Sequence, residues 1–533
     1  MAFSDLPRII RKEITWGKHP EQLIEDENQS LTITLTNGRT AIIHEDQIAA
    51  KKEKPSYWAI FAAGAGLFSD GYVNNSISTA STCLKNIYGS QYTNSHAIQN
   101  VSSVAFVGTV VGQLSFGIFS DYISRKTGML VACTGMIFFA ILCAGAWGIG
   151  TEACVGCYAG GLFTALTIYR FFLGIFIGAE YPTGSAACAE ASSLLPVGKR
   201  NKYFAWFTNF MIDTGFVISA FVPMVMLWIC GTDNLQPVWR VTLGLGAIPP
   251  LSLFFLRLKF SEGEQFQKLN FKSVKVPWML CLRFYWWRLI VVSIIWWIYD
   301  FSAYAFGIYS SPIINTIVPD ADMYKTFGWN IVFNLFYIPG AFLGAIVTDY
   351  IGPRLTLATG VFTQAIVGYA MAANYETLTR HVAGFTVVYG IFMTLGEFGP
   401  GDNIGLLAAK TSSTPVRGVY YGLAAAIGKI GAFSGTYAFP AFQAHFPGYL
   451  GYQVPFYLAS SLAILAGFLA LFCLPPVDQE AMQREDLRFL QYLTAHGFDV
   501  SQLGEGSFGK TFKAEAETVL VEDKKDTQDG EST

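Results

Sequence analysis

A carboxylate lies in the middle of one of the most apolar stretches of the sequence, LIVVSIIWWIYDFSAYAFGIYSS (residues 289–311). Asp300 follows Trp296 by four residues and precedes Tyr304 by four, so the three side chains share one face of a helix. An indole N–H, a phenol O–H and a carboxyl group together can hydrogen bond a polar solute. Proton coupling also requires a carboxyl group that is protonated on one side of a membrane and deprotonated on the other. The pattern therefore predicts a solute or proton site rather than an ordinary aromatic stripe.

Other ionisable residues also lie within apolar segments. A charged side chain at the centre of a membrane helix costs about 2.5–3.5 kcal/mol on insertion scales, so it is expected to face a cavity or a partner. The alternative is an ion pair that locks two helices together. The residues concerned are Asp70, Arg170, Glu180, Glu190, Asp213, Asp300, Glu397, Asp402 and Lys429.

The composition is that of a membrane protein. Of 533 residues, 52% are hydrophobic and 14% are charged, against roughly 25% charged in a soluble domain. The net charge of −3 gives no reason to expect nucleic acid as a partner. Cys154 and Cys157 form a lone C-x-x-C without a second pair or nearby histidines, so we expect buried free thiols and neither a metal site nor a cofactor.

The apolar segments predict an all-α membrane protein with twelve transmembrane helices. Each segment has the roughly 20 apolar residues that a spanning helix needs. They are residues 57–80, 99–120, 128–148, 157–181, 203–230, 240–257, 286–310, 328–349, 355–373, 383–406, 418–440 and 453–474. Basic residues concentrate in alternate loops, which places both termini in the cytoplasm by the positive-inside rule.

The two halves of the chain resemble each other. The segment GQLSFGIFSDYISRK, with Gly117, Asp121, Arg125 and Lys126, parallels GAFLGAIVTDYIGPR, with Asp349 and Arg354. Two related bundles of six helices with a site between them are the plan of a secondary transporter. We expect these paired motifs to control gating at the cytoplasmic ends of the helices.

These features divide the chain into five parts. Residues 30–44 alternate around Asn37-Gly38, which is typical of a β-hairpin. The expected parts are a cytoplasmic N-terminal segment with this possible hairpin (1–56), an N-terminal bundle (57–257), a cytoplasmic central loop (258–285), a C-terminal bundle (286–475) and a partly disordered cytoplasmic tail (476–533).

Together, the motifs resemble the major facilitator superfamily. The loop G-x-x-x-D-x-x-x-R-K from Gly117 to Lys126 and the segment R-x-x-x-G-x-x-x-G-x-x-x-P from Arg170 to Pro182 are similar to its signatures. Within the superfamily, FSDGYVNNS, GAEYP, WWIYDFSAY and EFGPGDN resemble the fungal phosphate:proton symporter group, and its glycerophosphodiester permease branch most closely.

The resemblance implies roles for individual residues. Substrate contacts would come from Tyr181, Asn209, Trp296, Asp300, Tyr304, Asn403 and Lys429. Proton coupling would involve Asp70, Glu180 and Asp300, with Arg170 as the partner of the first two acids. The chain departs from the phosphate:proton symporters at Gly401, where those proteins usually have Asn. The smaller residue would leave room for a substituent on the substrate's phosphate. Asp213, Glu397 and Asp402 would extend the polar cavity.

The sequence therefore predicts a proton-coupled importer of an organic phosphate, such as glycerophosphoinositol, that works by alternating access. It would be a multi-pass protein of the plasma membrane, surrounded by lipid and functional as a monomer. One alternative is a symporter for inorganic phosphate or another organic anion, such as a carboxylate. Another is a nutrient sensor that signals through its tails. An enzyme is not expected, because no nucleophile–base pair or nucleotide loop is visible.

Overall fold

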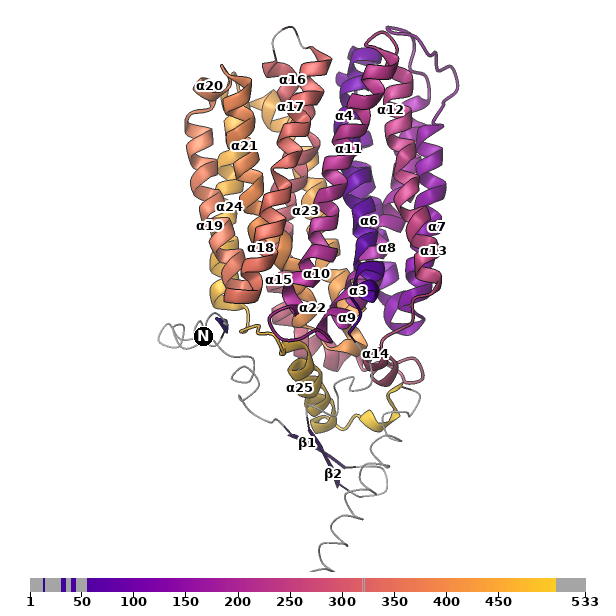
Figure 1. Cartoon of the computed structure of the whole chain (residues 1–533), viewed down its shortest axis with the longest axis vertical. Coiled ribbons are helices and arrows are strands. Elements are labelled where there is room, and N and C mark those ends of the chain that lie inside the picture. The colour runs from indigo at the N-terminus through magenta and orange to yellow at the C-terminus, as the bar shows by residue number, and fades with distance from the viewer. Residues whose placement is uncertain are drawn as a thin grey trace, which may run out of the picture.

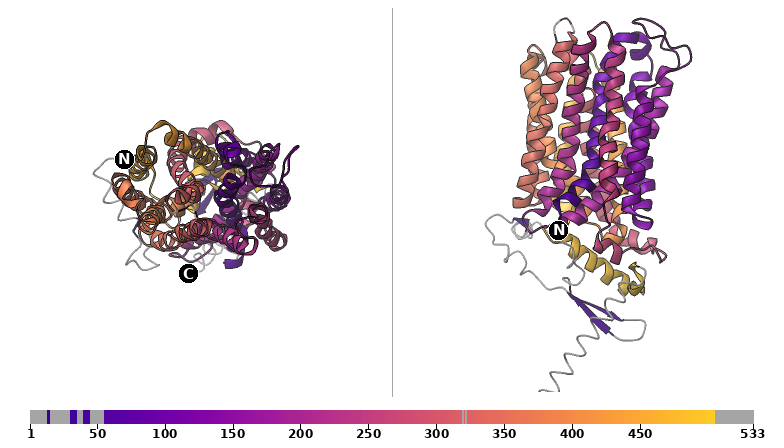
Figure 2. Two further views of the ribbon diagram at one scale, coloured as in Figure 1. Left: turned by 90° about the horizontal axis from the view of Figure 1, so that it is seen from above. Right: turned by 45° about the vertical axis from the view of Figure 1, so that its right-hand side comes forward.

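Long helices stand side by side, nearly parallel to the long axis of the molecule, in the computed structural model (Figure 1). The structure describes residues 13–14, 30–34, 40–44, 55–318, 320 and 322–504. Viewed from above, the helices of the first half (indigo to magenta) gather on one side and those of the second half (orange to yellow) mostly on the other (Figure 2).

The helices of the first half are α3 (Tyr57–Gly64), α4 (Phe68–Tyr88), α5 (Ser90–Thr93), α6 (Ala97–Tyr122), α7 (Arg125–Ala144), α8 (Leu162–Glu180), α9 (Ala186–Ser193), α10 (Arg200–Phe207), α11 (Asn209–Cys230), α12 (Leu235–Gly244) and α13 (Ile248–Leu258). Several of them are consecutive parts of one longer span, as α8 and α9 are.

The second half repeats this plan after a short connecting helix, α14 (Glu264–Lys268). Its helices are α15 (Trp278–Ile308), α16 (Ser310–Ile317), α17 (Met323–Leu335), α18 (Tyr337–Ile351), α19 (Pro353–Ala373), α20 (Tyr375–Leu378), α21 (Val382–Gly396), α22 (Asp402–Lys410), α23 (Arg417–His445), α24 (Leu450–Cys473) and α25 (Ala481–Ala495).

Within the described residues, ten helical segments are long and apolar enough to cross a membrane. The helical stretches 57–88 and 417–445 are less apolar, because polar side chains such as Asp70 and Lys429 are buried along them. Both stretches pack in the interior: α4 lies against α11, and α23 lies between α15 and α6. Two long helices of lower hydropathy thus lie at the junction of the two halves.

Glycines bring helices α6 and α8 into close contact. A Cβ at Gly112 would lie 2.0 Å from the carbonyl oxygen of Ile175, and one at Gly178 would lie 2.3 Å from that of Thr109. Small residues at such positions let two helix backbones approach. The glycines of the segment that begins at Arg170 therefore serve helix packing.

Two long helices, one in each half, contain a π-helical turn. Residues Tyr181–Ser185 join α8 to α9, and residues Glu397–Gly401 join α21 to α22. Each turn contains a proline, Pro182 or Pro400, whose missing N–H interrupts the regular α-helical hydrogen bonds. Such turns often occur at functional sites, because they redirect side chains.

The tail elements and the loop between α7 and α8 lie at opposite ends of the molecule (Figure 1). Strands β1 (Ser30–Thr34) and β2 (Thr40–His44) pair antiparallel near α25. Asn37 and Gly38, the expected turn, lie outside the described residues. The far loop meets the end of α4, where the Gly156 N–H donates to the Ile87 carbonyl.

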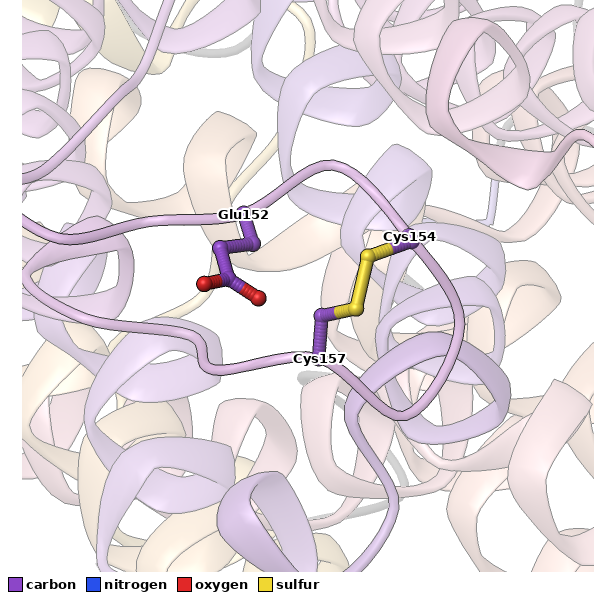
Figure 3. A group of neighbouring side chains, drawn as sticks. All are labelled: Glu152, Cys154 and Cys157. Carbon is purple, nitrogen blue, oxygen red and sulfur yellow. A yellow bond between two sulfur atoms is a disulfide. The ribbon is translucent and has the colours of Figure 1, made fainter.

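That far loop corrects the expectation for the C-x-x-C. Cys154 and Cys157 are bonded to each other as a disulfide, with Cα atoms 5.3 Å apart, rather than being buried thiols (Figure 3). Glu152 lies beside them and is exposed. The three residues have the types and spacing of a metal site, but both sulfurs are committed to the disulfide. The two cysteines are not buried because they lie in the loop between α7 and α8 and not in a helix.

Candidate substrate and proton site

A central cavity of about 50 Å³ lies where the two halves meet. Its polar and aromatic lining comes from both halves: Tyr181, Phe204, Thr208, Asn209 and Phe216 from the first, and Trp296, Tyr299, Asp300, Tyr304, Tyr337, Glu397, Asp402, Tyr421 and Lys429 from the second. A cavity of this size is smaller than the roughly 300–1,000 Å³ of a typical ligand pocket. Binding of an organic solute therefore requires helices to move apart.

One end of the cavity is organised around Lys429 of α23. Its ammonium group hydrogen bonds to the Tyr304 hydroxyl and lies 3.2 Å from Asp300 Oδ2. The same nitrogen lies 3.7 Å from the centroid of the Tyr304 ring and is buried. Lys429 thus supplies a positive charge at the centre of the membrane domain, balanced by carboxylates.

Asp70 of α4 connects this cation to the first half. Its Oδ2 accepts hydrogen bonds from the hydroxyls of Tyr304 at 2.8 Å and Tyr181 at 2.6 Å, and it lies 3.8 Å from Lys429 Nζ. Its other oxygen accepts from Asn74 at 2.6 Å. Because Asp70 and Tyr181 belong to one half and Tyr304 and Lys429 to the other, this network spans the junction.

Trp296 forms an aromatic wall beside the network. Its ring centroid lies 5.4 Å from that of Tyr421 and 6.3 Å from that of Tyr181. A Cβ at Gly428 would lie 2.5 Å from the indole Cδ1, so the glycine makes room for the ring. The triplet Trp296, Asp300 and Tyr304 does line the cavity, as its spacing predicts.

The other end of the cavity carries carboxyl groups. Glu397, in the π-helical turn, accepts from the Tyr299 hydroxyl at 2.7 Å and from Asn209 Nδ2 at 3.1 Å. The same amide nitrogen donates to Asp402 Oδ1 at 3.2 Å. Asp213 lies one helical turn beyond Asn209 on α11, and its buried carboxylate oxygens have no hydrogen-bond partner among the described residues.

Five expected site residues are not among those that line the cavity: Asp70, Arg170, Glu180, Asp213 and Asn403. The expected pairing of Arg170 with Asp70 and Glu180 is wrong. Glu180 instead makes a buried bidentate pair with Arg257 of α13, at 2.6 and 2.8 Å. Arg170 and Glu180 are ten residues apart, about 15 Å along a helix, so one guanidinium does not serve both acids.

Arg170 is fully buried, and its one hydrogen bond among the described residues goes to the Val73 carbonyl at 3.5 Å. Asn403 bonds away from the cavity, accepting from the Thr348 hydroxyl at 2.8 Å and donating to the Gly399 carbonyl at 2.7 Å. The helix that follows the π-helical turn thus places Asp402 in the cavity lining and Asn403 outside it.

Sequence reasoning missed Arg257 because it lies at the edge of an apolar segment, where a basic residue usually marks the end of a membrane helix. It also missed Tyr299, which directly precedes Asp300 and therefore lies off the helix face that Trp296, Asp300 and Tyr304 share. The two π-helical turns were not predicted either, and they change which side chains share a helix face. The prolines inside GAEYP and EFGPGDN were the available signal.

The paired loop motifs cap helices of the opposite half. Asp121, at the end of α6, accepts from the backbone N–H groups of Gly418 at 2.9 Å and Val419 at 2.7 Å, at the start of α23. Asp349, at the end of α18, accepts from those of Asn201 at 3.1 Å and Lys202 at 3.3 Å, at the start of α10. A carboxylate at a helix N-terminus is favourable, so both caps hold the halves together.

The basic residues of the motifs support these caps differently. Arg125 pairs with Glu190, which also accepts from Arg417 at 2.6 Å. Lys126 donates to the Leu258 carbonyl at 2.8 Å. Arg354 makes two 2.9 Å hydrogen bonds to Glu13 near the N-terminus. Gly117 lies close to the other half, since a Cβ there would be 3.0 Å from the Gly418 carbonyl oxygen.

Comparison with known proteins agrees with this arrangement. The model of the sugar (and other) transporter family matches residues 58–273 and again residues 261–483. The chain belongs to this transporter family. The expected all-helical major facilitator fold is confirmed by likeness to the proton:xylose symporter XylE, whose structure aligns with a TM-score of 0.66 at 16% identity over 82% of this chain and 98% of that one.

Relatives of higher identity carry more specific names. The chain is 54% identical over 517 residues to the major glycerophosphoinositol permease of Candida albicans, covering 95% of this chain and 93% of that protein. It is 51% identical over 524 residues to a glycerophosphocholine permease of the same organism, covering 97% and 94%. The resemblance to the glycerophosphodiester permease branch is therefore confirmed.

Proposed function

We propose that the protein is a proton-coupled secondary transporter that imports a glycerophosphodiester, such as glycerophosphoinositol, by alternating access. The observation that carries this proposal is the contact of Lys429 with Tyr304 and Asp300 in a cavity between the two halves. The names of the two Candida relatives supply the substrate class.

The mechanism follows from the charges at the Lys429 end. The ammonium group is balanced by Asp300 and Asp70, so an entering phosphodiester anion competes with both carboxylates for it. Protonation of Asp300 or Asp70 removes a negative charge and frees Lys429 for the phosphate. Tyr181, Tyr304 and Trp296 then offer neutral donors to the phosphate oxygens. In this scheme proton and anion bind together, which is the requirement for symport.

The same reasoning proposes indirect roles for the buried residues outside the cavity. Glu180 would affect proton coupling through its ion pair with Arg257. Arg170 would affect it through its hydrogen bond to the Val73 carbonyl of α4. The Asp121 and Asp349 caps would close the cytoplasmic gate in both halves. Asn403 would act by holding the π-helical turn rather than by contacting substrate.

We also propose twelve spans, adding the stretches 57–88 and 417–445 to the ten apolar segments, with both termini in the cytoplasm of a plasma-membrane protein. Support comes from the disulfide between Cys154 and Cys157, which lies at the end opposite the tail elements. Disulfides persist in oxidising surroundings and are rare in the cytosol. The five-part division of the chain, lipid surroundings and a functional monomer belong to the same proposal.

Uptake into proteoliposomes tests this function. We expect an imposed pH gradient, acidic outside, to drive accumulation of radiolabelled glycerophosphoinositol by the wild type. The variant Asp300→Asn should lose about 100-fold or more of the gradient-driven rate, because that acid can no longer release a proton next to Lys429. Asp233→Asn, an exposed residue in the loop after α11, is the matched control and should transport normally.

Equal uptake with and without the gradient, or an unimpaired Asp300→Asn variant, would remove proton coupling. Uptake of inorganic phosphate or a carboxylate in place of any glycerophosphodiester would favour the rival anion symporter. A protein that binds glycerophosphodiesters but moves none of them would point to a sensor.

A further inference from the structure

The carboxyl end of the cavity has no role in phosphate binding or in the proton step described above. Asp213, Glu397 and Asp402 are each at most 2% exposed. Among the described residues, the ion pairs at the cavity are those of Lys429 with Asp300 and with the neighbouring Asp70. Within the described residues, no basic side chain forms an ion pair with Asp213, Glu397 or Asp402.

The unpartnered carboxylate of Asp213 indicates that this end of the cavity can bind a ligand. Neither of its oxygens has a hydrogen-bond partner among the described residues, although the side chain is fully buried. It lies one turn from Asn209 on the same face of α11, although it is not among the residues that line the cavity. Asp402 does line the cavity, and its Oδ2 also has no hydrogen-bond partner among the described residues. A buried carboxylate without a partner is costly unless a ligand or a proton satisfies it.

The donors at this end are already engaged. Asn209 Nδ2 donates to both Glu397 and Asp402, and the Tyr299 hydroxyl donates to Glu397. Polyol hydroxyls can donate hydrogen bonds to these carboxylates, but they carry no positive charge to balance them. A quaternary ammonium group supplies that charge, and it requires only negative charge and aromatic faces.

Aromatic rings complete such a surrounding. Phe216, Tyr299 and Tyr337 line the same cavity, and the Phe216 and Tyr337 centroids are 4.9 Å apart. Gly401 keeps the site open to Glu397, because a Cβ there would lie 2.3 Å from Glu397 Oε2 and 2.9 Å from the Tyr299 hydroxyl. Aromatic rings with adjacent carboxylates are the usual surroundings of an organic cation.

We propose that Asp213, Glu397 and Asp402 form a subsite for a cationic substituent, an organic ammonium group, on the phosphodiester. The cavity is then bipolar: Lys429 holds the phosphate and the three acids hold the ammonium. This rests on the proposed function, and it selects zwitterionic glycerophosphodiesters such as glycerophosphocholine over anionic ones such as glycerophosphoinositol.

Competition uptake in wild-type proteoliposomes is the first test. We expect unlabelled glycerophosphocholine to inhibit uptake of a labelled glycerophosphodiester at a concentration about tenfold lower than glycerophosphoinositol, a factor that corresponds to one favourable charged contact. Equal inhibition, or stronger inhibition by glycerophosphoinositol, would overturn the subsite. Failure of the wild type to take up either compound would instead overturn the proposed function.

Neutral variants locate the subsite. Glu397→Gln and Asp402→Asn should each raise the KM for glycerophosphocholine about tenfold, while the KM for glycerophosphoinositol changes less than about threefold. Retained glycerophosphoinositol uptake shows that each variant is folded. Glu376→Gln, an exposed acid in α20, is the control. A parallel rise for both substrates, or loss of glycerophosphoinositol uptake alone, would contradict the assignment.

Discussion

At the scale of single residues, the buried carboxylate of Glu180 depends on Arg257 of α13 to balance its charge. This pairing depends on how α13 packs against α3 and α7, and nothing in the local sequence specifies that packing. Trp296, Asp300 and Tyr304, by contrast, line the cavity because the i, i+4 rule depends only on helix geometry.

The pair of Glu180 and Arg257 gives a stability prediction. Arg257→Met leaves the Glu180 carboxylate buried without its cation and removes hydrogen bonds to the Ala62 and Ala63 carbonyls. Breaking a buried pair in this way costs about 3–5 kcal/mol. We expect a clearly lower melting temperature for the purified protein in detergent, measured by the loss of monodisperse protein on heating.

The exposed pair of Glu376 and Arg380 provides the control. Its side chains are 58% and 67% exposed, and such pairs contribute about 0–1 kcal/mol. Arg380→Met should therefore melt close to the wild type. An Arg257→Met protein that melts with the wild type would show that the buried pair is not structural.

At the scale of elements, the apolar segments predicted the long helices, but they did not predict the π-helical turns that shape the site. The expected segments 157–181 and 383–406 each end inside or run through a π-helical turn that hydropathy does not register. These turns place Tyr181 and Glu397 in the cavity and move Asn403 out of it. The repeated G-x-x-x-D motif predicted equivalent positions in the two halves. Only the structure shows that each aspartate accepts backbone hydrogen bonds from a helix of the opposite half.

The two helix caps make a prediction about local opening. Asp121→Asn weakens charge-assisted hydrogen bonds to the N-terminus of α23, each of which contributes about 1.5–3 kcal/mol. We expect backbone hydrogen exchange in residues 417–421 to become about tenfold faster or more. Asp349→Asn should have the same effect in residues 200–204, at the start of α10.

Each variant serves as the reference for the other, since the two caps lie on different helices. Lys126→Gln, which loses only a contact to the Leu258 carbonyl, should leave both segments protected. Unchanged exchange at 417–421 in Asp121→Asn would mean that the cap does not hold the halves together.

At the scale of the whole molecule, the two halves contact each other on both sides of the cavity. The Asp121 and Asp349 caps join them at the end near the tails. At the other end, Asn75 donates to Asn334 at 2.9 Å, and the Thr82 and Ser311 hydroxyls lie 3.0 Å apart. The structure is therefore a closed state between the inward-open and outward-open forms, which agrees with the small cavity. Alternating access requires one of these sets of contacts to break at a time.

The orientation of the molecule in the membrane is the last prediction. A disulfide does not react with maleimide. If the loop of Cys154 and Cys157 faces outward, a membrane-impermeant maleimide should label this pair on intact cells only after an impermeant reductant opens the disulfide. In a Cys154→Ser, Cys157→Ser background, His496→Cys, an exposed site after α25, should be labelled only after permeabilisation. The same background without His496→Cys measures labelling of the remaining cysteines. Labelling of His496→Cys in intact cells, or of the native pair only after permeabilisation, would reverse the proposed topology, since the two sites lie at opposite ends of one helical body.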